Sequence, residues 1–263
     1  MIRLWFVNLT DFFAESDRLK DLLSATEWER AKRQRVPQRR LEFITARGLL
    51  RLLLARELNI AAQRVPIDYT PYGKPKLVSA QDEQLQFNMS HSAGCALYAL
   101  SDDRPVGVDI EQIRSRRSVG SVARRLFTPS EQRFLFCATP NDDATDRFHA
   151  LWVRKEAYAK AVGTGLSSTL GCFEMLQDDE TPAGRSPTRS AERGSVADQT
   201  LFAVGRSIRV LRASGEPTDF VLRDLDIRVK DIVEKFAGAV CSVASVDHIR
   251  CDILQPDILQ VLR

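Results

Sequence analysis

Two stretches of this sequence share a helix-opening pattern, and that repetition constrains the fold more than any other feature. LSATEWER at 23–30 and FTPSEQRF at 127–134 each contain an apolar residue, then a hydroxyl residue, then a glutamate three positions later. This pattern is a capping box, in which the hydroxyl and the glutamate satisfy backbone donors at the start of a helix. The two predicted capping boxes are Ser24 with Glu27 and Thr128 with Glu131.

The match continues downstream in the same order. FITARGLLRLLLAREL from Phe43 and FHALWVRKEAYAKAVG from Phe148 both have the apolar spacing of an amphipathic helix. Later, AGCALYALS at 93–101 resembles AGAVCSVAS at 237–245, and both are typical of strands. Three matches in one order predict an α+β protein built from two similar α/β halves related by pseudo-twofold symmetry.

The division between the halves is predicted at residue 105. The first half would comprise 1–104 and the second 105–263, and the third match requires an insertion in the second half. A candidate for part of it is 177–200, which is rich in Ser, Gly, Pro and charge and has no periodic apolar face. We therefore expect a mobile surface loop at about 177–200.

Composition indicates a compartment. Hydrophobic residues make up 44% and charged residues 28% of 263 residues, and no apolar run is long enough to span a bilayer. The N-terminal IRLWFVNL is interrupted by Asn8 and Asp11 before any cleavage site for a signal peptide. The 5 cysteines form no CxxC pair, which argues against a disulfide framework or zinc site. We expect a cytoplasmic protein that does not bind membranes.

A basic run lies between Arg30 and Arg40. RAKRQRVPQRR contains no acidic residue, so it is either a solvated helix face or a surface that attracts anions. Binding of single-stranded nucleic acid would favour aromatic residues within the run, whereas Trp28 and Phe43 only flank it. We predict no nucleic-acid partner and assign no individual role within the run.

Two carboxylates alternate with apolar residues in PVGVDIEQI, residues 105–113. Strand side chains alternate between faces, so Asp109 and Glu111 should point one way while Val108 and Ile110 point the other. One interpretation is a half-exposed edge strand with solvated charges. The other is a cation held between the two carboxylates, which requires a third ligand from elsewhere in the chain.

A third carboxylate follows in the predicted helix from Phe148. Trp152, Glu156 and Lys160 recur every four residues and should share one helix face. An exposed Glu–Lys pair is the usual meaning of this spacing. The helix runs into VGTGL, however, whose two glycines can end the helix or bring backbone close to a bound group.

Four motifs in order resemble those of the 4′-phosphopantetheinyl transferase superfamily. PVGVDIE and, further on, WVRKEAYAKAVGTGL are similar to its signature pair, preceded by YGKP from Tyr72 and FNMSHSAG from Phe87. The resemblance is to the longer, two-half type, which activates carrier proteins of peptide, polyketide and fatty-acid synthases. It is most specific between about residues 72 and 166.

The resemblance implies a reaction and a metal. Such enzymes, holo-[acyl-carrier-protein] synthases, move the 4′-phosphopantetheine arm of coenzyme A onto a serine of an apo acyl or peptidyl carrier protein. The other product is adenosine 3′,5′-bisphosphate. Mg²⁺ would assist, with Mn²⁺ as a substitute, because hard cations bind carboxylates and phosphate oxygens. The implied metal ligands are Asp109, Glu111 and Glu156.

The resemblance also implies roles for basic and polar residues. Lys160 would lie near the pyrophosphate and act in catalysis together with Glu156, our preferred general base, although a metal-bound water acting with one of the acids is an alternative. Arg47 would contact the 3′-phosphate. The residues predicted to bind coenzyme A are Arg47, Lys74, Ser90, His91, Lys155 and Lys160.

A noncatalytic module that binds coenzyme A or a carrier protein is the alternative function. It would keep Lys74, His91 and Arg47 without needing three carboxylates, so the complete acid set favours the enzyme. We further expect a monomer that acts as a pseudo-dimer, with its active site at the interface of the halves. His149 and His248 are predicted to be structural, because neither has a nucleophilic partner in the sequence.

Overall fold

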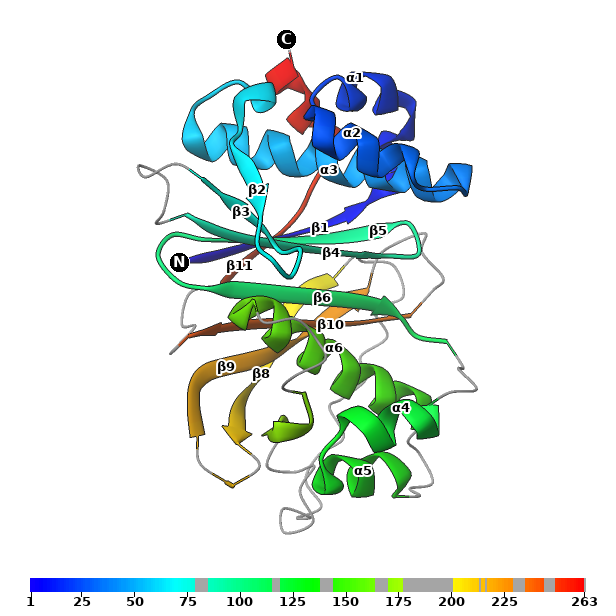
Figure 1. The fold of residues 1–263 in the computed structure, drawn as a ribbon, viewed down its shortest axis with the longest axis vertical. Helices are drawn as coiled ribbons and strands as arrows, with labels where there is room; N and C mark the ends of the chain where they lie inside the picture. Colours follow the sequence, from blue (N-terminus) through cyan, green and yellow to red (C-terminus); the bar gives the residue numbers. More distant parts are fainter. Residues whose placement is uncertain are drawn as a thin grey trace.

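The structure is a computed structural model, and it arranges helices and strands in layers (Figure 1). Two β-sheets lie in the middle, and helices cover the outer face of each. The predicted α+β class is thereby confirmed, whereas the insertion expected at 177–200 falls outside the described residues. The residues described are 1–78, 85–114, 119–137, 144–163, 170–176, 201–212, 214–215, 217–228, 235–243 and 249–262.

The first sheet has the strand order β11-β1-β5-β4. The pairs β1–β5 and β5–β4 are antiparallel, while β11 lies parallel to β1. The helices α1, α2 and α3 cover this sheet, and β2 and β3 form a separate hairpin beside it. The bounds are β1 Ile2–Asn8, α1 Ser16–Lys20, α2 Ala25–Lys32, α3 Pro37–Leu58, β2 Ile67–Tyr69, β3 Pro75–Leu77, β4 Gln86–Ser92, β5 Cys95–Ser101 and β11 Ile249–Ile253.

The second sheet is antiparallel, with the order β6-β10-β9-β8-β7. Its helices α4, α5 and α6 lie on the side away from the first sheet. The bounds are β6 Val106–Gln112, α4 Val119–Leu126, α5 Pro129–Phe136, α6 Ala144–Val162, β7 Phe173–Glu174, β8 Leu201–Arg212, β9 Pro217–Arg228 and β10 Phe236–Val243. Short 3-10 helices occur at Leu9–Glu15, Ala62–Arg64, Leu170–Cys172 and Pro256–Leu262.

The predicted repeats fall on matching elements. Both capping boxes are present, Ser24 with Glu27 at α2 and Thr128 with Glu131 at α5, and each is followed by a long helix. The strand-like matches are β5 and β10, each of which lies between two antiparallel partners. The order β1-β5-β4 in one sheet thus corresponds to β6-β10-β9 in the other.

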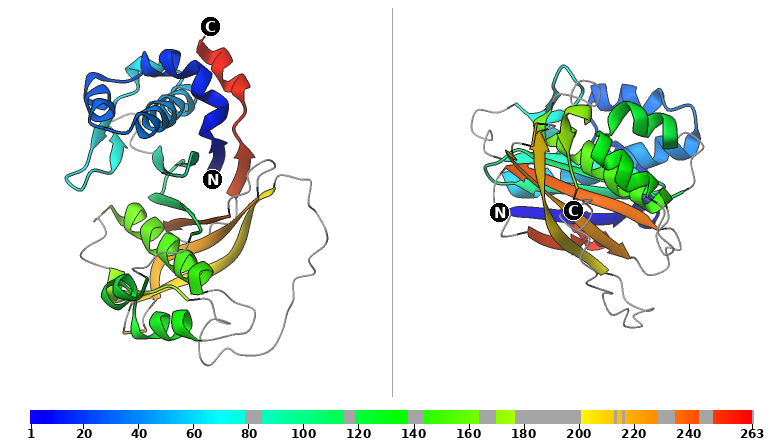
Figure 2. Two further views of the ribbon diagram at one scale, coloured as in Figure 1. Left: turned by 90° about the vertical axis from the view of Figure 1, so that its right-hand side faces the viewer. Right: turned by 90° about the horizontal axis from the view of Figure 1, so that it is seen from below.

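The end of the chain returns to the first sheet. Strand β11 pairs with β1, in the register Ile2 opposite Ile249, and the two strands lie side by side in Figure 2. Leu254 and Ile258, which follow β11, belong to the core beneath α3. Residues 249–262 therefore lie with the first half, whereas the division predicted from the sequence places them in the second half, 105–263.

Among the described residues, four apolar clusters hold these elements together: one packs α4 and α5 against α6, and another lies between the two sheets. The cluster between the sheets contains Leu4 and Phe6 of β1, Leu97 of β5, and Val108 and Ile110 of β6. A third cluster joins β1, β5 and α3, and a fourth joins α6 to the second sheet. The apolar residues of β6 therefore face the first sheet, as the alternation predicted.

A glycine allows α6 to lie close to β6. A Cβ atom added at Gly107 would lie 2.1 Å from the Ala157 carbonyl oxygen and 2.3 Å from the Ala161 nitrogen. These distances are far below contact, so any side chain at Gly107 would push the helix away. The close approach sets the distance between the predicted site residues of α6 and those of β6.

Among the described residues, the longest helices are too polar to cross a bilayer. The largest, α3, has arginines at Arg47, Arg51 and Arg56 within its apolar sequence.

Candidate active site

The site is built on a seam between β4 and β6, which are edge strands of different sheets. Side chains rather than a backbone ladder connect them. Every second residue of β4 takes part, because alternate residues share a face of a strand. The contacts are Asn88 Oδ1 accepting from Val108 N at 2.9 Å, Ser90 Oγ donating to Asp109 Oδ1 at 2.7 Å, and Ser92 Oγ donating to Glu111 Oε2 at 2.9 Å.

Asp109 is the buried centre of this seam, with 4% of the residue exposed. Its Oδ1 accepts from Lys160 Nζ at 2.6 Å and from Ser90, while Oδ2 is buried without a hydrogen-bond partner. Burial raises the pKa of Asp109, and the positive charge of Lys160 opposes that rise. A buried carboxylate with one free oxygen can accept a cation or a donor.

Glu156 lies on α6, one turn before Lys160. Burial raises its pKa to about 7, and the negative charges of Asp109 and Glu111 act in the same direction, while Lys160 opposes them. Asp109 and Glu111 are thus close enough for their negative charges to act on the Glu156 carboxylate. Near neutral pH, Glu156 can therefore exchange a proton, as a general base must.

The fit of these residues to a metal ion can be tested on their chemistry. Within the part of the chain that the structure describes, no three His, Cys, Asp or Glu side chains are grouped closely enough to hold a metal. The Lys160 ammonium instead neutralises Asp109. The donors themselves suit Mg²⁺, because they are hard carboxylate oxygens and Asp109 Oδ2 lacks a partner.

A cavity of about 380 Å³ opens beside the seam. It receives side chains from α3, from the hairpin of β2 and β3, from β4 and from α6, so both halves contribute. Five of the predicted residues line it, whereas Asp109, Glu111 and Ser90 belong to the seam and are absent from the lining. The lining is Phe43, Ala46, Arg47, Tyr72, Gly73, Lys74, Pro75, Asn88, Met89, His91, Glu156, Ala159, Lys160 and Gly163.

Lys74 connects the hairpin to the second half. Its Nζ lies 3.4 Å from the Val106 carbonyl oxygen and 3.3 Å from that of Ala161, near the C-terminus of α6. Burial lowers the pKa of Lys74 to about 8. Burial also lowers the pKa of His91, and the charge of Lys160 adds to the effect.

Lys155, predicted to bind coenzyme A, does not line this cavity. Its ammonium is fully buried, 2.8 Å from Glu131 Oε2, and it also donates to the Phe173 carbonyl oxygen. Consecutive residues of an α-helix point about 100° apart, so Lys155 turns away from the cavity that Glu156 lines. The structure places Lys155 in the scaffold of the second half.

Sequence reasoning also missed residues that support the site. Ser92 and Asn88 belong to the quoted FNMSHSAG motif, and their spacing of two from Ser90 could have indicated them. Glu27 was identified as part of a capping box, but its second contact, with the arginines of α3, carried no local signal. Two histidines were predicted to be structural. His149 is fully buried, with Nδ1 2.8 Å from the Thr145 carbonyl oxygen. His248 lies outside the described residues.

A cavity lined by Arg47, Lys74 and Lys160 and by Glu156 is typical of an enzyme site that takes an anionic substrate. Comparison with known proteins gives the family. A model described as "4'-phosphopantetheinyl transferase, N-terminal" matches residues 13–101, and one described as "4'-phosphopantetheinyl transferase superfamily" matches residues 105–201.

Several named relatives agree. The 4′-phosphopantetheinyl transferase HetI of Nostoc sp. is 35% identical over 75% of this chain and 81% of its own length. A 4′-phosphopantetheinyl transferase of Bacillus subtilis is 31% identical over 66% of this chain and 77% of its own length. The slr0495 protein of Synechocystis sp. is 37% identical over 60% of this chain and 63% of its own length. The chain belongs to the 4′-phosphopantetheinyl transferase superfamily, which confirms the predicted family and the prediction of a transferase.

Proposed function

We propose that this chain transfers the 4′-phosphopantetheine arm of coenzyme A to a serine of an apo acyl or peptidyl carrier protein. The holo carrier and adenosine 3′,5′-bisphosphate are the products. The observation that carries the proposal is one cavity lined by Arg47, Lys74, His91 and Lys160 and also by Glu156. Cations to hold a polyanion and a carboxylate able to take a proton are the two requirements of this transfer.

Coenzyme A binding is assigned to the cationic lining. Arg47 suits the 3′-phosphate, because a guanidinium offers a fork of donors to phosphate oxygens. Lys74 and His91, which line the cavity, are assigned to the nucleotide and its phosphates, and Ser90 is assigned to the same ligand from the seam. Lys160 lies beside Asp109 and is assigned to the pyrophosphate, whose negative charge changes as the bond to the arm breaks.

Asp109, Glu111 and Glu156 would hold Mg²⁺, or Mn²⁺ in its place. When bound, the metal would neutralise charge on the pyrophosphate. The free Oδ2 of Asp109 and the raised pKa of Glu156 support this assignment, because a cation would relieve the repulsion among the three carboxylates. Ser90 and Ser92 hold the carboxylates of β6 in place.

Proton removal from the carrier serine is assigned to Glu156. Its pKa of about 7 leaves a substantial ionised fraction at neutral pH, and its side chain lines the cavity. Lys160, one turn away, stabilises negative charge on the departing pyrophosphate oxygen. The helix α6 therefore carries the acid–base group and the charge-stabilising group on one face.

The arrangement of the site follows from the two halves. We infer that they are related by a pseudo-twofold axis, supported by the corresponding strand orders β1-β5-β4 and β6-β10-β9 and by the two capping boxes. The site would then lie at their interface, and a monomer would suffice for activity. The cytoplasm is the compartment in which we expect it to act.

Mass spectrometry of intact carrier proteins tests the function. Several apo carrier proteins would be incubated with this protein, coenzyme A and Mg²⁺. A mass increase equal to the phosphopantetheine arm on the carrier serine is the expected result. Binding of coenzyme A without that increase on any carrier, in the presence of either Mg²⁺ or Mn²⁺, would instead support the noncatalytic binding module.

A further inference from the structure

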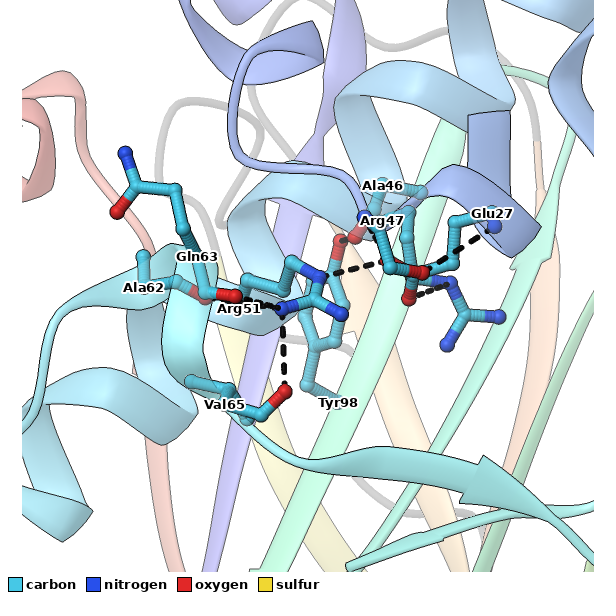
Figure 3. A network of polar contacts seen from close by, with 9 residues as sticks. Glu27, Ala46, Arg47, Arg51, Ala62, Gln63, Val65 and Tyr98 are labelled. Atoms are coloured by element: carbon cyan, nitrogen blue, oxygen red, sulfur yellow. Dashed lines mark hydrogen bonds and ion pairs between the residues drawn. The ribbon is translucent and has the colours of Figure 1, made fainter. Parts of the chain in front are cut away.

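A buried polar network lies where α2 crosses α3 (Figure 3). At its centre is Glu27, which is 1% exposed. The Oε2 atom of Glu27 accepts from the Ser24 backbone N–H at 2.9 Å, completing the capping box, and from Arg51 Nε at 2.6 Å. Oε2 is therefore committed to the scaffold, while Oε1 has no hydrogen-bond partner.

Arg51 is a structural residue. Its Nη1 donates to the carbonyl oxygens of Ala62 at 2.9 Å and Val65 at 3.2 Å, which fixes the chain after α3 against the helix. Its side chain is buried, and it is absent from the cavity lining. These contacts hold the Arg51 guanidinium away from the substrate.

Arg47 lies one turn earlier on α3 and behaves differently. It lines the cavity although only 7% of the residue is exposed, and both Nε and Nη1 are buried without hydrogen-bond partners. Its guanidinium lies 5.8 Å from the Phe43 ring and 5.9 Å from the Tyr69 ring. Its carboxylate neighbour is Glu27, with Oε1 3.6 Å from Arg47 Nε. Unused donors on a buried cation at a cavity wall suit an anionic ligand.

We propose that Glu27 is a positioning residue for substrate binding. Its carboxylate is shared, so that Oε2 fixes Arg51 in the scaffold and Oε1 holds the Arg47 guanidinium at the cavity wall with donors free for the 3′-phosphate of coenzyme A. This inference rests on the proposed function, in which Arg47 contacts that phosphate. A buried guanidinium that loses its counter-ion is driven toward water. Without Glu27, Arg47 would therefore leave its preorganised position.

The inference predicts the direction in which removal of the Glu27 charge changes the affinity for the substrate. If Glu27 acted only through its charge, removing it would make the cavity more positive and strengthen binding of a phosphate. If Glu27 positions Arg47, removing its charge should weaken that binding. Glu27→Gln separates the two, because glutamine is also tolerated in a capping box and keeps the shape of the side chain.

The second half supplies a matched control. Glu131 is the capping-box glutamate of α5 and also pairs with a buried cation of a long helix, Lys155, which does not line the cavity. Glu131→Gln thus removes an equivalent buried charge without touching the substrate. The experiment compares steady-state kinetics of the full chain and both variants with coenzyme A and with dephospho-coenzyme A, which lacks the 3′-phosphate. Thermal melting of each variant is recorded in parallel.

Glu27→Gln is expected to raise the KM for coenzyme A about tenfold with little change in kcat, because a remote phosphate contact acts mainly on ground-state binding. The KM for dephospho-coenzyme A should change much less. Glu131→Gln should lower the melting temperature without changing the ratio of the two KM values. If Glu27→Gln does not fold, Glu27→Gln with Arg51→Met removes both buried charges, and the same kinetic result is expected from it.

Combining Glu27→Gln with Arg47→Ala distinguishes this inference from the proposed role of Arg47. Non-additive effects on KM show that Glu27 acts through Arg47. If Arg47→Ala is equally damaging with both substrates, the 3′-phosphate assignment fails, but the coupling still tests positioning. A KM for coenzyme A that falls or stays unchanged in Glu27→Gln, or additive effects in the double variant, would overturn the inference.

Discussion

The two long helices, α3 and α6, are built alike and used differently. Each follows a capping-box helix whose glutamate is buried and paired with a cation of the long helix, Glu27 with Arg51 and Glu131 with Lys155. In both halves, one glutamate therefore caps a short helix and neutralises a charge inside the core. Such pairs fix the crossing of two helices, because separating them would leave an unpaired buried charge.

The difference lies in what else the two glutamates touch. Glu131 uses its other oxygen to accept from the Met175 backbone N–H at 2.9 Å, so every contact it makes is structural. Glu27 instead faces Arg47, which lines the cavity. The second half contributes Glu156 and Lys160 from a different face of α6. Under the proposed function, two similarly built helix pairs thus carry an anion-binding group in one half and acid–base groups in the other.

The largest loss of activity is expected when Asp109, the buried carboxylate at the centre of the seam, is removed. Asp109→Ala should lower turnover by about a thousandfold, because it removes a proposed metal ligand and the partner of Lys160. Its fold should persist, since burial already disfavours the charged form of Asp109 and raises its pKa. The measurement is carrier modification by mass spectrometry, with thermal melting as the control. Undiminished activity at saturating Mg²⁺ would disprove the metal assignment.

A smaller effect distinguishes the two helices directly. Lys160→Ala should lower kcat about a hundredfold, because it removes charge beside the reacting pyrophosphate. Arg47→Ala should mainly raise the KM for coenzyme A, about tenfold, because the 3′-phosphate does not react.

Dephospho-coenzyme A is the control for this pair. With that substrate, the penalty of Arg47→Ala should largely vanish, while the penalty of Lys160→Ala persists. Equal losses of kcat in both variants would show that the two helices do not divide binding and chemistry as we propose.

Some features of the two halves could be predicted from the sequence. The capping boxes, the long helices and the common face of Asp109 and Glu111 depend on neighbours within a few residues, and local spacing reveals them. The partners of Glu27, the seam at Ser92 and the burial of Lys155 depend on packing between distant elements. Local spacing carries no information about those contacts. For the same reason, the return of β11 to the first sheet was missed, because a strand pattern does not name its partner.

The pH dependence of stability gives a still smaller effect, confined to the second half. Burial and the neighbouring acids raise the folded-state pKa of Glu156 from 4.5 to about 7. The unfolded state then binds fewer protons between these values, so this group's stabilising contribution is present below pH 4.5 and lost as pH rises through 7. Without divalent cations, we expect Glu156→Gln to reduce the loss of stability between pH 5 and 7 by about 2 kcal/mol.

Urea unfolding with a chelator present would measure that difference. Glu42→Gln is a suitable control, because Glu42 lies on the opposite half and shows how much of the pH dependence is general. Identical pH profiles for the wild type and Glu156→Gln would show that Glu156 does not lie in the shared field of Asp109 and Glu111.

The smallest expected effect on activity concerns Lys155, whose sequence neighbourhood predicted coenzyme A binding. Lys155→Met alone should lower the free energy of unfolding by about 3–5 kcal/mol, because it leaves Glu131 buried without its cation. Adding Glu131→Gln removes both charges and should restore much of that stability. If the pair serves only the scaffold, the folded double variant should keep kcat and the KM for coenzyme A within about twofold of the wild type. Lys160→Met, on the same helix but facing the cavity, is the matched control and should lose activity strongly. A large rise in KM in the stably folded double variant would instead return Lys155 to the substrate site and remove the contrast between the two buried pairs.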